Sequence, residues 1–197
     1  AHVAQAAKYL IREDASTFHT YYMNVHSGAP RYGNTQQGYA DDSCWSRGQA
    51  WGIYGFLLSY IYTGDTQKVA LSKKLANYFL NRLPEDAVCH WDLALVGTDA
   101  LRDSSSAAIA VCGLLELIKH LPVTDPDRER YQQWAMAIMS SLTRHYLMAK
   151  EEKGNGLLKH SVYHLSSNKG VDECASWGDY FYVEALVRFT QCWKLYW

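Results

Sequence analysis

Arg47 and Trp51, in the stretch "CWSRGQAWGIYGF", are the clearest candidates for chemistry in this sequence. Residues four apart on a helix project from the same side, one turn apart. A guanidinium binds anionic groups through paired hydrogen bonds, and an indole offers a flat apolar face for stacking. In one interpretation, Arg47 pairs with a buried carboxylate, such as Asp41 or Asp42. In the other, the helix start opens to water, Arg47 meets an anionic ligand and Trp51 forms a stacking wall.

The acidic residues near helix starts have a simpler explanation than catalysis. Asp41 and Asp42 precede an apolar stretch, Asp103 precedes "SSSAA", and Asp179 lies in "WGDY". Carboxylates at such positions accept hydrogen bonds from free N–H groups and are favoured by the helix dipole. We therefore expect these side chains to cap helices or to make structural hydrogen bonds.

The composition narrows the class of protein. The chain has 197 residues and a formal net charge of −1, which argues against binding to nucleic acid or to an anionic membrane surface. No apolar run reaches the roughly 18 residues of a transmembrane helix. Seven Trp, 15 Tyr and five Phe suit a carbohydrate cleft as well as a core. We expect a single domain over residues 1–197.

The cysteines and histidines do not follow the common metal-site motifs. The five cysteines are odd in number and form no CxxC pair, and the eight histidines include no HExxH motif. We therefore expect reduced thiols, no metal and no cofactor. Reduced thiols slightly favour the cytoplasm, and the sequence leaves a periplasmic location open.

Helical periodicity dominates the chain. It predicts helices over residues 2–13, 43–62, 66–82, 104–120, 126–148 and 175–195, with a short strand near Tyr21, Tyr22 and Val25. The helices that begin near 43, 104 and 175 are apolar or small on most sides, and the others are amphipathic. We therefore expect an all-α fold with an inner layer of helices covered by an outer layer. Long loops enter each inner helix, so a cleft is expected at that end.

Three stretches, in order along the chain, resemble one enzyme family. They are "GNTQQGYADDSCWSRGQAWGIYGF", "RDSSSAAIAVCGLLEL" and "GVDECASWGDYFYVEALVRF". The sequence is similar to the unsaturated glucuronyl hydrolases of glycoside hydrolase family 88. The resemblance implies an (α/α)6 barrel of six helical hairpins, of which the predicted helices supply about half. We expect the chain to be the C-terminal half, a fragment that begins within a helix pattern and without an initiator Met.

The resemblance implies an unusual hydrolysis. Family members act on oligosaccharides released by polysaccharide lyases, in bacterial degradation of glycosaminoglycans, and hydrate the 4,5 double bond of a terminal unsaturated glucuronic acid. An aspartate of the N-terminal half serves as general acid and base, so we expect no catalytic residue in this chain and an inactive isolated fragment. The alternatives are a non-catalytic carbohydrate-binding fragment, the related unsaturated rhamnogalacturonyl hydrolases and an unrelated helical interaction scaffold.

The resemblance also assigns substrate-binding residues. His19 in "STFHTYY" and Gln37 in "TQQGY" match substrate-site residues of the family, and Arg47 and Trp51 match those that contact and stack on the unsaturated sugar. Without the resemblance, His19 is interpreted as an ordinary loop or core histidine and Gln37 as a turn residue.

A second stretch, "HLSSNKG", matches a motif that accommodates a sulfate on the following sugar. Some family members have Ser-x-x-Ser-x-Lys here, and this chain has His164, Ser167 and Lys169. A hydroxyl and an ammonium can hold a sulfate oxygen, but His164 replaces the first serine. The alternative is a solvated loop with a single lysine.

Half of a barrel predicts a partner. Its inner helices would expose apolar sides to water where the other helices belong. We expect the partner to be the N-terminal half of the same protein or a second copy of this chain, in addition to the unsaturated oligosaccharide.

Overall fold

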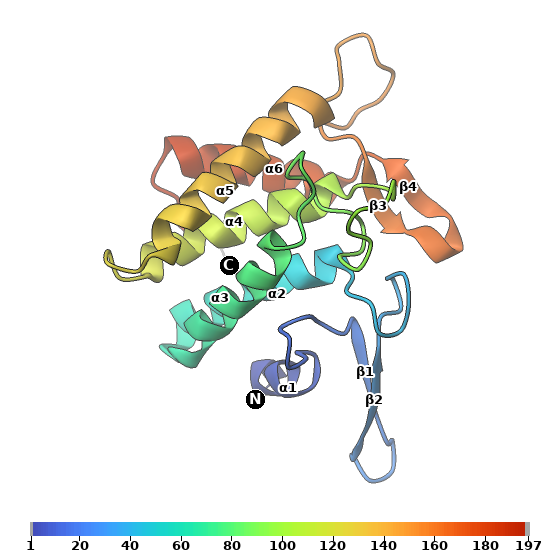
Figure 1. Ribbon diagram of the computed structural model, residues 1–197, viewed down its shortest axis with the longest axis vertical. Coiled ribbons are helices and arrows are strands. Elements are labelled where there is room, and N and C mark those ends of the chain that lie inside the picture. The colour runs from blue at the N-terminus through green and yellow to red at the C-terminus, as the bar shows by residue number, and fades with distance from the viewer. Residues whose placement is uncertain (1, 196–197) are drawn as a thin grey trace.

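The computed structural model describes residues 2–195 and is mainly helical (Figure 1). Its helices are α1 (His2–Tyr9), α2 (Ser46–Thr63), α3 (Gln67–Leu80), α4 (Ser104–His120), α5 (Asp127–Ser141) and α6 (Ser176–Thr190). Its strands are β1 (Thr20–Met23), β2 (Pro30–Asn34), β3 (Ser161–His164) and β4 (Lys169–Glu173). Within this range no helix combines the length and the apolar character that a membrane span requires.

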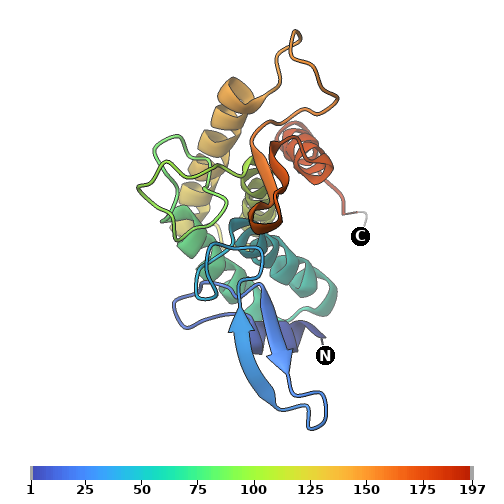
Figure 2. The same ribbon diagram turned by 90° about the vertical axis from the view of Figure 1, so that its right-hand side faces the viewer.

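The helices form an inner and an outer layer. Helix α4 lies at the centre, packed against α2 and α6, while α3 and α5 cover the outside (Figures 1 and 2). Every residue from Ser104 to Leu114 is buried. A Cβ atom on Gly113 would lie 2.9 Å from Ile53 Cγ2 and 3.2 Å from the backbone nitrogen of Tyr54, so α2 and α4 approach closely there. The predicted alternation of inner and outer helices is confirmed.

Several helix ends differ from the sequence prediction. Helix α1 ends at Tyr9, because the following residues turn back and Ile11 forms a β-bridge with Thr17. Helix α5 ends at Ser141 and continues as a π-helical turn, Leu142–Tyr146. Helix α2 ends at Thr63, and the next residue, Gly64, has the left-handed φ of 72° that commonly terminates a helix.

Two β-hairpins are the main departure from a purely helical expectation. Strands β1 and β2 pair antiparallel, as do β3 and β4, where His164 lies opposite Lys169. Tyr21 and Tyr22 lie in β1 as predicted, but Val25 lies beyond the strand and is 90% exposed. The other three strands were missed, because each has only four or five residues and none alternates between buried and exposed positions.

The predicted helix caps are confirmed only in part. Asp103 caps α4, accepting hydrogen bonds from the backbone N–H groups of Ser105 and Ser106. Asp41 and Asp42 do not cap α2, because Trp45 immediately precedes that helix and no side chain caps it. The prediction that these two residues cap a helix was therefore wrong.

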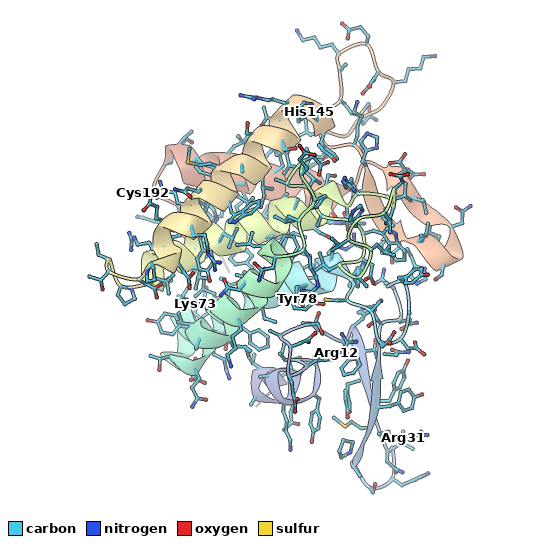
Figure 3. The ribbon with its side chains drawn as sticks, viewed as in Figure 1. Arg12, Arg31, Lys73, Tyr78, His145 and Cys192 are labelled. Carbon is cyan, nitrogen blue, oxygen red and sulfur yellow. The ribbon has the colours of Figure 1, made fainter. Side chains whose placement is uncertain are left out.

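Charged side chains tie the outer layer together. Lys73 of α3, labelled in Figure 3, forms ion pairs with Asp125 at 2.7 Å and Asp127 at 2.9 Å, at the start of α5.

The five cysteines are free thiols. Burial raises the pKa of Cys44 to about 11, so this thiol stays protonated at neutral pH.

The starts of the three inner helices lie at one end of the molecule. Figure 2 looks onto this end, where both hairpins and the long connections gather. Ser46 of α2 and Ser106 of α4 are joined by a hydrogen bond of 2.9 Å, and Trp177 of α6 donates to Ser105 at 3.0 Å. The fold therefore brings the conspicuous sequence segments to one end, as the loop lengths predict.

Candidate functional site

Arg47 lies at the centre of this end and is almost fully buried. Arg47 is the second residue of α2. Its guanidinium forms an ion pair with Asp103 at 3.0 Å, and both side chains are buried. The guanidinium also lies over the indoles of Trp45, at 4.6 Å, and Trp177, at 5.1 Å. Burial lowers the pKa of Arg47 and the Asp103 carboxylate opposes this, so the side chain remains a cation. The structure therefore supports pairing with a buried carboxylate, contributed by Asp103 rather than by Asp41 or Asp42.

Asp103 links two inner helices through one buried carboxylate. Besides the backbone N–H groups at the start of α4, it accepts hydrogen bonds from the hydroxyls of Ser105 at 2.5 Å and Ser106 at 2.7 Å. These donors, together with Arg47, satisfy a carboxylate that has no exposed surface. The sequence predicts the cap but does not predict the pairing with Arg47, because 56 residues separate the two.

The remaining donors of Arg47 bind the backbone of β3. Its Nη1 donates to the carbonyl of Val162 at 2.8 Å and its Nη2 to the carbonyl of Tyr163 at 2.9 Å. The side-chain amide of Gln37 donates to the same Tyr163 carbonyl at 2.8 Å. Thus two predicted site residues from separate segments meet at one carbonyl of the hairpin.

His19 joins the same cluster from the loop before β1. Its ring lies 4.6 Å from the Trp45 ring, and its Nδ1 accepts a hydrogen bond from the backbone N–H of Gln37 at 3.1 Å. Burial lowers the pKa of His19, and the charges of His164 and Arg47 lower it further. His19 is therefore a neutral imidazole at pH 7, with its proton on Nε2, because Nδ1 acts as the acceptor.

Trp51 faces a cavity of about 500 Å³ between α1 and α2. Its side chain is 37% exposed, and one edge packs against Phe181 with ring centroids 5.1 Å apart. His19 lines the same cavity, whereas Arg47 and Gln37 do not. Gly55, one turn after Trp51, leaves open space where a side chain would begin. One side of α2 thus carries a buried cation at its start and an accessible indole a turn later.

The loop between β3 and β4 brings His164, Ser167 and Lys169 together at the tip of the hairpin. The Nδ1 atom of His164 accepts the Ser167 hydroxyl at 2.6 Å and the Ser167 backbone N–H at 3.2 Å. Lys169 is exposed and lies opposite His164 in the ladder. Its ammonium makes no ion pair with any residue from 2 to 195. The three residues form a basic tip in which Ser167 and Lys169 are exposed and His164 is half-buried.

Asp92 is a buried carboxylate that sequence reasoning missed. It accepts hydrogen bonds from the hydroxyl of Ser43 at 2.6 Å and from the backbone of Tyr39 at 2.9 Å and Cys44 at 3.2 Å. These bonds fix the segment that enters α2, so Asp92 supports the site without facing the cavity. Within the described part of the chain, no cluster of three or more His, Cys, Asp or Glu is suited to hold a metal ion.

Comparison with known proteins reveals clear relatives, although no protein-family model matches the chain. It is 50% identical over 198 residues to the unsaturated chondroitin disaccharide hydrolase of Streptococcus pneumoniae, covering 100% of this chain and 50% of that protein. The crystal structure of unsaturated glucuronyl hydrolase from Streptococcus agalactiae matches with a TM-score of 0.95 and 49% identity, covering 100% of this chain and 50% of that one. A variant of that enzyme complexed with dGlcA-GalNAc6S matches with a TM-score of 0.90 and 49% identity, covering 100% and 52%.

These matches define both the fold and the family. The chain spans about half the length of the curated relatives it matches, and that half is the C-terminal one. The similar structures are α/α barrels, so the helices described above are part of such a barrel. By sequence and by fold, the chain belongs to the unsaturated glucuronyl hydrolase family.

Proposed function

We propose that the protein hydrolyses unsaturated uronyl oligosaccharides by hydrating the 4,5 double bond of a terminal unsaturated glucuronic acid. The observation that carries this proposal is the match over 100% of the chain, at a TM-score of 0.90, to a structure complexed with dGlcA-GalNAc6S. In the reaction, C4 of the vinyl ether takes a proton and C5 takes the oxygen of water. The resulting hemiketal opens, and the bond to the next sugar breaks. Water is therefore the only co-reactant.

The part of the site in this chain would bind and orient the sugar. Trp51 offers an accessible indole, and neutral His19 shares its cavity. Arg47 and Gln37 lie beside them at the start of α2 and in the preceding loop. No aspartate or glutamate lines this cavity, which agrees with a general acid contributed by the other half of the barrel.

We propose that the second sugar lies towards the tip of the β3–β4 hairpin. Lys169 and Ser167 supply an ammonium and a hydroxyl for a sulfate, as the resemblance implies. In this structure the Ser167 hydroxyl donates its proton to a hydrogen bond with His164 Nδ1, so that proton is not available to a sulfate oxygen. With the Ser167 hydroxyl engaged in this way, the affinity for sulfate depends mainly on Lys169.

A partner is required for a complete barrel. Four large apolar residues along α6 are 40–46% exposed, namely Tyr180, Val183, Leu186 and Phe189. Neighbouring members are three residues apart and shift by about 60° at each step, so together they form an apolar stripe that winds partway around the helix. We propose that the N-terminal half of the same protein covers this stripe, because the relatives are about twice as long as this chain. A second copy of the chain is the alternative occupant.

An absorbance assay tests the proposed reaction. The intact natural protein, with whatever chain flanks residues 1–197, is mixed with an unsaturated chondroitin disaccharide, and the absorbance of the 4,5 double bond is followed. We expect the absorbance to disappear, because hydration removes the double bond, and a saturated disaccharide should not be cleaved. A stable absorbance at high protein concentration would contradict the proposal. Binding without turnover would favour a non-catalytic carbohydrate-binding protein.

A further inference from the structure

We infer that Arg47 and Gln37 are positioning residues for the β3–β4 hairpin, and that they set the place of its tip relative to the cavity beside Trp51. This inference rests on the proposed function for its consequence in catalysis. Its structural part rests on hydrogen bonds alone. Under this inference, two residues that are predicted to bind substrate also hold the β3–β4 hairpin in place, and the second sugar would bind at the tip of that hairpin.

The hairpin is attached to the helical layer through the carbonyls of β3 and of the residues before it. Arg47 binds the carbonyls of Val162 and Tyr163, and Gln37 adds a second donor to the latter. At the base of the hairpin, the Ser104 hydroxyl donates to the Lys159 carbonyl at 2.6 Å. The carbonyl groups along this edge are thus held by side chains of α2, α4 and the loop before α2.

The geometry suits a guanidinium and would not suit an ammonium. Arg47 must reach a carboxylate at 3.0 Å and two successive carbonyls at 2.8 and 2.9 Å at once. A planar fork of donors can do this in a fixed direction, whereas lysine has three donors on a single nitrogen. Asp103 balances the charge and fixes the orientation of the fork. Because the donors are charged and buried, each bond to a carbonyl is stronger than a neutral one.

The held carbonyl directly precedes the tip of the hairpin. Tyr163 is followed by His164, the first of the three residues of the basic tip, and its ring lies 5.6 Å from that of Trp177. Beyond this point the loop is largely exposed and few contacts fix it. The distance between the Trp51 cavity and the basic tip therefore depends on the bonds at Tyr163. Loosening them should change how the second sugar is recognised more than it changes the first.

The substitution Gln37→Glu tests this inference with little change in shape. It replaces the amide donor by a carboxylate oxygen, which repels the Tyr163 carbonyl. Gln36→Glu is the matched control, because Gln36 is exposed and forms no hydrogen bond with another described residue, yet the charge change is the same. Arg47→Lys is a second variant, which keeps the charge beside Asp103 but loses the fork. All are made in the intact natural protein.

Two measurements distinguish a loss of hairpin positioning from a general loss of stability or activity. Hydrogen exchange of the amides from 161 to 173 should accelerate about tenfold in Gln37→Glu, the equivalent of one lost hydrogen bond, and should not change in α4. The ratio of kcat/KM for a sulfated over an unsulfated unsaturated disaccharide should fall severalfold in both variants and remain unchanged in Gln36→Glu.

Two results would overturn the inference. One is exchange in the hairpin that stays at the wild-type rate in Gln37→Glu. The other is an equal loss of kcat/KM for both substrates, which a merely structural role would produce. If the wild-type protein hydrolyses neither substrate, the proposed function fails, and the exchange rates still decide the positioning role. If Arg47→Lys does not fold, Gln37→Glu decides alone.

Discussion

At the scale of single residues, the site is organised around one buried ion pair. The sequence draws attention to Arg47 and Trp51 through their spacing, but the two side chains have different environments. Arg47 is satisfied by Asp103 and by carbonyls, whereas Trp51 remains accessible beside a cavity. The spacing alone could not reveal this, because the partner of Arg47 lies on another helix. Buried pairs that depend on long-range contacts are not encoded by local pattern.

His19 should titrate below the ordinary histidine pKa of about 6.5. Burial and the nearby positive charges lower its pKa, so its neutral form is favoured in the folded state. Protonation would also break the bond from the Gln37 N–H to Nδ1. The stability that the neutral ring contributes is therefore present above the unfolded pKa and is lost as pH falls through the lower folded pKa.

The titration can be followed by NMR of the imidazole protons, with His19→Asn used to assign the signal. A midpoint below 6.5 is expected, and the free energy of unfolding of the wild type should fall more steeply than that of the variant as the solution is acidified through this midpoint. A midpoint at or above 6.5 would show that the imidazole is solvated and that the site around it is open.

The substitution His164→Ser should strengthen recognition of a sulfated second sugar. In this structure the Ser167 hydroxyl donates to His164 Nδ1, so it has no proton to offer to a sulfate oxygen. A serine at 164 removes that acceptor and adds a second hydroxyl. We expect kcat/KM for the sulfated disaccharide to rise severalfold relative to the unsulfated one, measured on the same preparation. A ratio that falls would mean that His164 itself binds the anion.

At the scale of elements, the sequence predicts the helical layers well and the hairpins poorly. The helices are recognised because a strong apolar periodicity reflects the faces that they bury. Strands β2 and β4 are short and mostly exposed, and β3 has four residues with two adjacent buried ones, so none of the three shows such a pattern. The β3–β4 hairpin depends on distant donors, Arg47 and Gln37, that no local rule identifies. The candidate site residues of the hairpin, His164, Ser167 and Lys169, were therefore predicted from family resemblance alone.

Two glycines in the inner helices should respond oppositely to alanine. At Gly113 a Cβ would lie 2.9 Å from Ile53 and 3.2 Å from backbone, so Gly113→Ala should destabilise by about 1–3 kcal/mol through overpacking. At Gly55 nothing lies within 4 Å of a Cβ, so Gly55→Ala should stabilise by up to about 1 kcal/mol through helix propensity. Urea unfolding of both variants measures the difference. Equal effects would contradict the close approach of α2 and α4.

At the scale of the whole molecule, the inner and outer helices present different kinds of surface to water. The inner helices that should face the centre of a barrel include α6, which has an apolar stripe in contact with water. The outer layer, in contrast, carries the charged residues expected of a protein surface, such as the Lys73 cluster. This asymmetry agrees with the half-length coverage of the relatives.

The apolar stripe on α6 should be the contact with the other half. Val183→Asp would place a charge in its centre and should weaken association with the N-terminal half of the Streptococcus agalactiae enzyme at least about tenfold, because an unpaired charge would be buried. Val123→Asp is the matched control, since Val123 is 85% exposed in the loop between α4 and α5. Analytical ultracentrifugation measures both. Equal affinity for the two variants would place the interface elsewhere.

The central claim is that residues 1–197 supply one half of a hydrolase site and require the other half for turnover. The most direct measurement follows the double-bond absorbance of an unsaturated chondroitin disaccharide while this chain is titrated into the N-terminal half of the Streptococcus agalactiae enzyme. We predict no loss of absorbance with either half alone, and a rate that rises on mixing and levels off at an equimolar ratio. A loss of absorbance caused by residues 1–197 alone, or a mixture that forms a complex but leaves the absorbance unchanged, would contradict the account.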